Sequence, residues 1–182
     1  MAQSDSDFST RLRASRWGVS LALATIFFGF GLGGVFGAFE GPLKNSLSER
    51  AAAVADSVYG GDAAKMNSVV DKSWSYTKRA HLHGGAIGSA ALGAILLLAL
   101  LRRPSEWVRR FAALALGVGG LGYSLFWLAA AFLAPGLGST DAAKESLSWL
   151  AVPSAGLLLL GMLAVGLLTV LELFAPRQVA RE

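Results

Sequence analysis

Four long stretches of the sequence contain almost no charged residues, and this feature restricts the chain to one class of protein. The stretches cover residues 17–39, 84–101, 111–134 and 149–174. Each is close to the length of about 20 apolar residues that a helix needs to cross the hydrocarbon core of a bilayer. The sequence therefore predicts an all-α integral membrane protein whose four helices form a bundle.

The composition agrees with a membrane protein and narrows the chemistry of its partners. The 182 residues are 54% hydrophobic and 15% charged, which is more apolar than an ordinary soluble domain, and they suffice for one compact domain, residues 1–182. The net charge of +4 comes from basic residues beside the apolar stretches, where anionic lipid headgroups attract them. We therefore expect the lipid bilayer, and no nucleic acid, as a partner. The absence of cysteine excludes disulfides and thiolate metal sites.

The distribution of basic residues between the four stretches predicts the orientation. Nine Lys and Arg residues lie in the N-terminal tail, the second connection and the C-terminal tail, and seven lie in the first and third connections. The seven are spread over a longer segment that also contains acidic residues. By the positive-inside rule both termini are expected in the cytoplasm, and the protein in a bacterial inner membrane. Because residues 17–39 exceed the apolar region of a signal peptide, we expect a retained signal anchor.

The one long segment between apolar stretches, residues 40–80, has a helical pattern of its own. Gly41 and Pro42 open it, and apolar residues then recur with helical spacing up to a turn at residues 59–62. A second helical pattern begins at Met66 and runs directly into the second apolar stretch. These patterns predict an external amphipathic helical hairpin and a second membrane helix that begins outside the bilayer.

Glycine is concentrated in the predicted membrane spans, which contain 17 of the 22 glycines. Stripes of small residues let helix backbones approach closely in a membrane. Two interpretations stay open, namely packing within this chain and contact with another subunit or a second copy. The predicted packing positions are Gly29, Gly33 and Gly37 in the first span, Gly85, Ser89 and Gly93 in the second, and Gly117 and Gly120 in the third.

A few residues inside the spans depart from the apolar pattern. Pro153 predicts that the fourth helix kinks or begins near it. Glu172 lies one turn from the end of that span, where a position at the headgroups near Arg177 is favoured over a proton relay. Trp127 lies deeper than the other tryptophans, which are close to span ends as is typical of membrane interfaces. No other Asp, Glu, Lys, Arg or His lies within a span, which argues against a charged pore.

The two histidines, His81 and His83, are the candidate ligands for site chemistry. Imidazole binds zinc, copper and haem iron. On a regular helix, residues i and i+2 point in nearly opposite directions, so both histidines reach one ion only where the backbone is not helical. Three interpretations stay open. The histidines are interfacial and cap polar groups, or they bind a metal or haem, with haem b or copper as candidates, or together with Lys78 and Arg79 they hold an anion or a quinone headgroup.

The run Arg79-Ala80-His81-Leu82-His83 and the Gly-rich apolar stretch after it carry a family resemblance. The run resembles the opening of the histidine-bearing second helix of subunit I in cbb3-type haem-copper oxidases and in their small four-helix relatives. The resemblance implies that His81 or His83 would be one ligand of a low-spin haem. That family uses a second histidine on a distant helix, whereas the third and fourth spans here contain none. Without that second histidine, the resemblance is compatible with haem held between subunits, with copper at the outer face, or with a scaffold that has no cofactor.

No motif in the sequence indicates a catalytic residue. Neither histidine has a carboxylate three or four residues away, and the glycine runs that look like dinucleotide fingerprints lie in the middle of spans. We therefore expect a small non-catalytic membrane subunit of a larger respiratory or metal-dependent complex. A haem- or copper-binding membrane protein is the first alternative, and a channel or carrier is the second.

Overall fold

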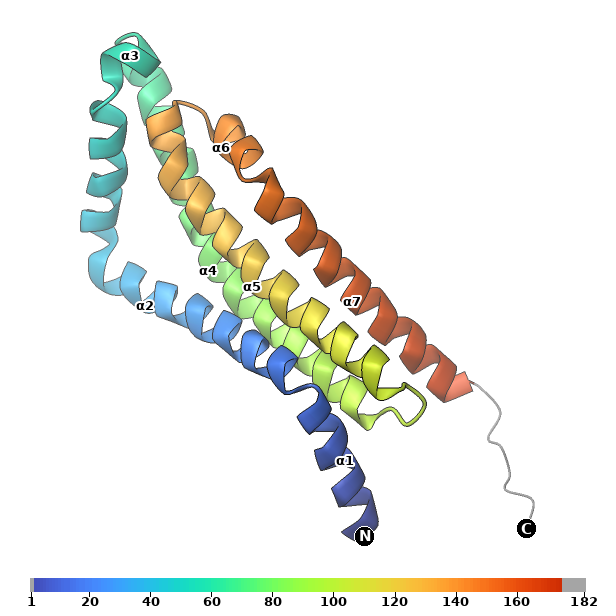
Figure 1. Ribbon diagram of the computed structural model, residues 1–182. Helices are drawn as coiled ribbons and strands as arrows, with labels where there is room; N and C mark the ends of the chain where they lie inside the picture. The colour runs from blue at the N-terminus through green and yellow to red at the C-terminus, as the bar shows by residue number, and fades with distance from the viewer. Residues whose placement is uncertain (1, 175–182) are drawn as a thin grey trace, which may run out of the picture.

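The computed structural model describes residues 2–174 and is built within that range from helices alone (Figure 1). Each of its four long helices is apolar enough to cross a membrane, which confirms the all-α class and the four candidate spans. The long helices are α2 (Arg16–Ala52), α4 (Ala63–Leu100), α5 (Glu106–Leu137) and α7 (Ser148–Phe174). The short helices are α1 (Ala2–Ala14), α3 (Ala55–Tyr59) and α6 (Thr140–Ser146).

Helix α5 has the central position, since it packs against α2, α4 and α7. Figure 1 shows α4, α5 and α7 running side by side, while the first half of α2 crosses them at an angle. The start of α2, the α4–α5 loop and the last turn of α7 lie at one end of the molecule, here called the basic end. Helices α3 and α6 lie at the opposite end, here called the hairpin end.

Helix α2 continues past the predicted end of the first span but bends there. Phe39 has φ −134° and ψ 29°, which are not helical values. Pro42 follows within one turn, and proline removes a backbone donor and crowds the carbonyl four residues before it. The apolar stretch therefore ends at a kink in a 37-residue helix rather than at a helix terminus.

The hairpin end has a small apolar core of its own, formed by parts of five helices. Its buried members are Ala51, Tyr59, Val69, Ala134 and Ala143. The Tyr59 hydroxyl donates a hydrogen bond to the carbonyl oxygen of Pro135 at 2.6 Å. Because that oxygen is among the last carbonyls of α5, which have no partner within the helix, Tyr59 caps α5.

The turn predicted at residues 59–62 is present and leads directly into α4. Gly60 and Gly61 have φ values of 60° and 76°, in the left-handed region that favours glycine. The Asp62 carboxylate then accepts a hydrogen bond from the Lys65 backbone N–H at 2.9 Å and caps α4. From there α4 runs without a break through Leu100, so the helix of the second span begins well before the apolar stretch, as predicted.

Four of the predicted packing positions face a neighbouring helix. A Cβ atom added to Gly29 would lie 2.3 Å from the backbone nitrogen of Gly85 on α4. One added to Gly117 would lie 2.9 Å from the carbonyl oxygen of Gly18 on α2. These approaches leave room for glycine alone, because backbone atoms cannot move aside. The other two positions with a close neighbour are Gly33 and Gly120.

At the remaining predicted positions the side-chain direction points away from the rest of the described chain. A Cβ atom added at Gly37, Gly85 or Gly93 would meet nothing within 4 Å, and Ser89 is exposed. The backbone of Gly85 lies against Gly29, but no residue of the described chain occupies the space on the side-chain side of these positions. We call Gly85, Ser89 and Gly93 the open α4 stripe.

Helix α4 instead packs through a face that is rotated by one residue. Gly84 lies against Gly29, and Gly88 lies against the α2 backbone. The same face continues with Ile95 and Leu98, which are fully buried. Burying these two large side chains gains more contact than burying glycines, so they decide which side of α4 faces inward.

At the basic end, Arg109 is a buried residue that caps α4. Its side chain is 2% exposed and donates hydrogen bonds to the carbonyl oxygens of Leu98, Leu101 and Pro104. The last carbonyls of a helix have no partner within it, and a guanidinium can satisfy several of them at once. Arg109 thus holds the α4–α5 loop and is not one of the arginines available to lipid.

Two residues of α7 that the sequence analysis singled out are Pro153 and Glu172. Pro153 lies in the second turn after Ser148, so the helix begins near it without a further kink. The Glu172 carboxylate accepts a hydrogen bond from the Arg103 backbone N–H at 3.0 Å, which ties the end of α7 to the α4–α5 loop. Arg177, its predicted neighbour, lies outside the described residues.

Candidate functional site

His81 lies half-buried between α4 and α2. Its Nδ1 atom is 2.7 Å from the carbonyl oxygen of Gly29. Because a carbonyl oxygen only accepts hydrogen bonds, Nδ1 carries the proton and donates it. The ring lies against Gly33, where an added Cβ atom would be 2.6 Å from Cε1, and the ring of Phe36 packs edge-on at 5.8 Å. Glycines of α2 thus make room for the imidazole and expose the carbonyl that orients it.

The hydrogen bond to Gly29 determines which atom of His81 is available for chemistry. With the proton on Nδ1, the neutral ring has its lone pair on Nε2. Histidines that bind metals usually donate their other ring N–H to a backbone carbonyl or a carboxylate in this way. Nε2 of His81 is therefore the ring atom that could bind a metal or accept a hydrogen bond.

His83 faces the opposite helix. Its ring lies 5.5 Å from the ring of Tyr123 and 5.9 Å from that of Trp127, both on α5. Because α4 is a regular helix at this point, the two histidines face different neighbours, as the helical geometry predicts. Within the part of the chain that the structure describes, no three His, Cys, Asp or Glu residues form a group that could hold a metal ion.

An aromatic cluster surrounds Trp127, the tryptophan that the sequence places deepest. The ring of Tyr76 packs edge-on against it at 4.9 Å, and the guanidinium of Arg79 lies 4.9 Å from the ring centroid. Trp127 is 9% exposed, and no described residue accepts a hydrogen bond from its Nε1–H group. A buried donor without an acceptor costs free energy. Arg79, a predicted anion-binding residue, lies over the rings of Trp127 and Tyr76.

Lys78, the neighbour of Arg79 in sequence, lies toward α2. It is exposed and close enough to Glu40 for an electrostatic interaction. Glu40 itself pairs with Lys44 at 2.5 Å, and the Lys44 ammonium lies 5.1 Å from the ring of Trp74. The four predicted site residues are thus divided, with His81 and Lys78 toward α2 and His83 and Arg79 toward α5.

The sequence interpretation missed Tyr123 and Trp127 as neighbours of His83, and Gly29 as the partner of His81. Helical phase alone carries part of this information, since His83 shares a face of α4 with Arg79 and Tyr76. The identity of the facing residues on α2 and α5 depends on how the helices pack, for which the sequence holds no local signal.

Comparison of the chain with family models, with curated proteins and with solved structures gives no match. Over residues 2–174 the fold by itself defines the class, a helical protein with four helices long and apolar enough to cross a membrane. The resemblance of the His81-Leu82-His83 run to cbb3-type oxidases remains a hypothesis.

Proposed function

We propose that the chain is a small non-catalytic subunit of a larger respiratory or metal-dependent complex in a bacterial inner membrane. Its four long helices form the membrane bundle, with both termini in the cytoplasm, and residues 40–80 belong to an external helical hairpin. The observation that carries the proposal is the open α4 stripe, where side chains added at Gly85 and Gly93 would meet no atom of the described chain.

An exposed stripe of small residues contributes little stabilising free energy when it faces lipid. Glycine costs about 1 kcal/mol relative to alanine inside a helix, and a missing side chain gives up dispersion contacts. In membranes such stripes are typical of surfaces where another helix approaches closely. Helix α4 packs on α2 through Gly84 and Gly88 and also packs against α5. The side-chain side of the open stripe therefore has room for a helix of another subunit or of a second copy.

The test is purification in a mild detergent, followed by analysis of mass and of bound partners. We expect the wild-type protein as a hetero- or homo-oligomer, and the G85L/G93L variant as a monomer. Both positions are open within the chain, so the variant should fold. The matched control is G166L on α7, a glycine that also has no neighbour within 4 Å. A wild-type protein that is monomeric and without a partner contradicts the proposal.

The geometry of His81 favours a second candidate, a protein that holds haem or copper at a subunit interface. The supporting observation is the Nδ1 hydrogen bond to Gly29, which leaves Nε2 in the orientation typical of a metal ligand. Further ligands would come from another subunit, because His83 faces away.

This candidate is tested on protein produced with haem and copper available. A Soret band or stoichiometric copper is expected in the wild-type protein and in H83A, and is expected to be lost in H81A. Absence of both signals in the wild-type protein removes the candidate. Equal loss in H81A and H83A would contradict the assignment to His81.

A further inference from the structure

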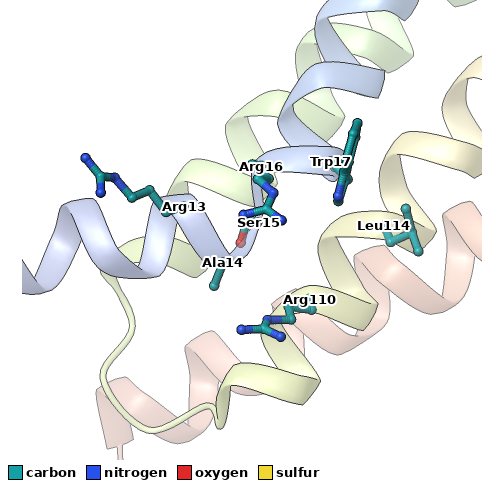
Figure 2. Close-up of a pocket in the computed structure, with 8 residues that line it drawn as sticks. Arg13, Ala14, Ser15, Arg16, Trp17, Arg110 and Leu114 are labelled. Atoms are coloured by element: carbon teal, nitrogen blue, oxygen red, sulfur yellow. The ribbon is translucent and has the colours of Figure 1, made fainter.

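A pocket at the basic end lies where α1 and α2 meet α5. The chain breaks helical geometry at Ser15, and the break borders a pocket of about 340 Å³. Figure 2 shows Arg16 on α2 and Arg110 on α5 approaching the same space from two helices, with Arg13 extending outward from α1. The pocket is separate from the two histidines, which lie near the middle of α4 (Ala63–Leu100).

The charge of the pocket is strongly positive. Three arginines line it and no carboxylate does. Arg110 is paired with Glu106 on its own helix at 2.6 Å, but both side chains are exposed, and such a pair contributes little. The first backbone bond of α2 runs from the Val19 N–H to the Ser15 carbonyl, and the amides before it add partial positive charge. Guanidinium groups bind phosphate through paired hydrogen bonds, so a phosphate group is the ligand that this lining fits.

An apolar groove begins where the pocket ends. Leu114 lines both the pocket and a second hollow of about 100 Å³ between α5 and α7. The groove is lined by apolar side chains only, among them Phe111, Val118 and Leu157. Because α5 runs from the basic end toward the middle of the molecule, the groove continues from the charged pocket toward the predicted membrane interior.

The position of Trp17 agrees with a charged pocket at the headgroups and an apolar groove in the hydrocarbon. Its ring is 67% exposed and borders the pocket, and exposed tryptophans are typical of the headgroup level of membranes. A free phosphate ion would use the arginines but would gain nothing from Leu114 or Val118. A phosphate that carries an acyl chain would use both parts.

We propose that the pocket and the groove together bind one anionic phospholipid. Arg16 and Arg110 hold its phosphate, and an acyl chain lies along Leu114 and Val118. The site is independent of any partner at the open α4 stripe and of any cofactor at His81.

The full-length protein, purified in a mild detergent, is titrated with phosphatidylglycerol and with phosphatidylcholine of the same acyl chains, and bound lipid is counted by native mass spectrometry. We expect phosphatidylglycerol to bind at one lipid per chain and to be preferred. In R16Q/R110Q its affinity should fall about thirty-fold, since each basic residue near an anionic surface contributes a factor of about five. The control R102Q/R103Q removes two arginines of the α4–α5 loop at the same end, and should change affinity by less than about three-fold.

A third variant separates lipid from free phosphate. Val118 is exposed, so V118W should fold, and its larger ring fills the groove without changing any charge. We expect V118W to weaken phosphatidylglycerol binding, and inorganic phosphate to bind the wild-type protein far more weakly than the lipid. Equal affinities for the two lipids would overturn the proposal, and so would a loss of affinity in R102Q/R103Q as large as that in R16Q/R110Q. The proposal would also fail if inorganic phosphate bound as strongly as phosphatidylglycerol and V118W left the binding of phosphatidylglycerol unchanged.

Discussion

Helices α5 and α7 are both apolar enough to cross a membrane, but they differ sharply in burial. In the most apolar 18 residues of each helix, 56% of the residues are buried in α5 and 11% in α7, although α7 is the more apolar of the two. In a water-soluble protein the more apolar helix would lie inside. Lipid, however, contacts leucine as well as protein does, so the inside position goes to the helix that packs most closely.

The side chains of the two helices explain the difference. The buried residues of α5 are mostly small, including Ala112, Ala113, Ala130 and Ala131. Helix α7 instead exposes a series of large apolar side chains, among them Leu159, Leu160, Leu163, Leu167 and Leu171. Its buried residues, Ser154, Gly161 and Val165, form one narrow stripe. Helix α5 therefore packs against three long helices, whereas α7 packs mainly against α5.

The largest expected effect comes from Arg109, which fixes the start of α5. In R109A the carbonyls of Leu98, Leu101 and Pro104 lose their donor in a buried position. Hydrogen bonds to a charged group contribute about 1.5–3 kcal/mol each, so the free energy of unfolding should fall by about 3 kcal/mol or more. It can be measured by titration with SDS in mixed micelles. The adjacent, exposed Arg110 is the control, and R110A should change stability by less than about 0.5 kcal/mol. Similar losses in both variants would show that Arg109 does not anchor α5.

A smaller effect is expected at the contact between the two helices. A Cβ atom on Gly119 would lie 2.6 Å from the backbone nitrogen of Leu158, so G119L must push α7 away from α5. Overpacking of this kind costs about 1–3 kcal/mol. The same SDS titration measures it, and G166L on the open side of α7 should be neutral. If G166L proved as harmful as G119L, the exposed side of α7 would have a protein neighbour rather than lipid.

The hydrogen bond from Tyr59 to Pro135 should stabilise the far end of α5 by about 1 kcal/mol. Y59F removes the donor while keeping the ring, and should lower the free energy of unfolding by that amount. Burial raises the pKa of Tyr59 above its ordinary value of 10.0. The contribution is thus complete below pH 10.0 and is lost as the pH rises through the higher folded-state pKa. Alkaline titrations of wild-type and Y59F protein should converge, and parallel curves would speak against this role of Tyr59.

The smallest effect is expected in α6, which connects α5 to α7. A hydrogen bond from Lys144 at 2.7 Å holds the pKa of the Asp141 carboxyl below its ordinary value of 3.8. The stability from this pair is therefore present above pH 3.8 and is lost as the pH falls through the lower folded-state pKa. Because the pair is exposed, D141N should change stability only slightly, and only above pH 3.8. A large change would mean that α6 contributes more to the position of α7 than its contacts indicate.

The sequence predicted the four long helices because hydropathy depends on composition alone and needs no knowledge of packing. It predicted the end of the first apolar stretch at residue 39 for the same reason, but not that the helix continues there through a kink. It did not predict the inward face of α4, because the stripes that begin at Gly84 and at Gly85 have the same spacing and differ by one residue. Burial of Ile95 and Leu98 decides between the two faces, and this burial exists only when α4 is packed against α2 and α5.

The candidate site was also predictable from the sequence only in part. Helical geometry predicted that His81 and His83 face different helices, but it could not supply the Gly29 carbonyl, which belongs to α2. Arg109 and Arg110 are adjacent and chemically identical, and one is buried while the other lines a pocket. That difference follows from helical phase and from the α1–α2 break at Ser15, which brings Arg16 close to α5.

The unbroken course of α4 has a consequence for the height of the molecule above a bilayer. Thirty-eight helical residues at a rise of about 1.5 Å each span about 57 Å, whereas the hydrocarbon core is about 30 Å thick. With Leu100 at the lower edge of that core, the start of α4 and the α3 turn would stand about 20 Å beyond the headgroups. At that height, the α3 turn and the start of α4 could be reached by a soluble protein that does not contact the lipid.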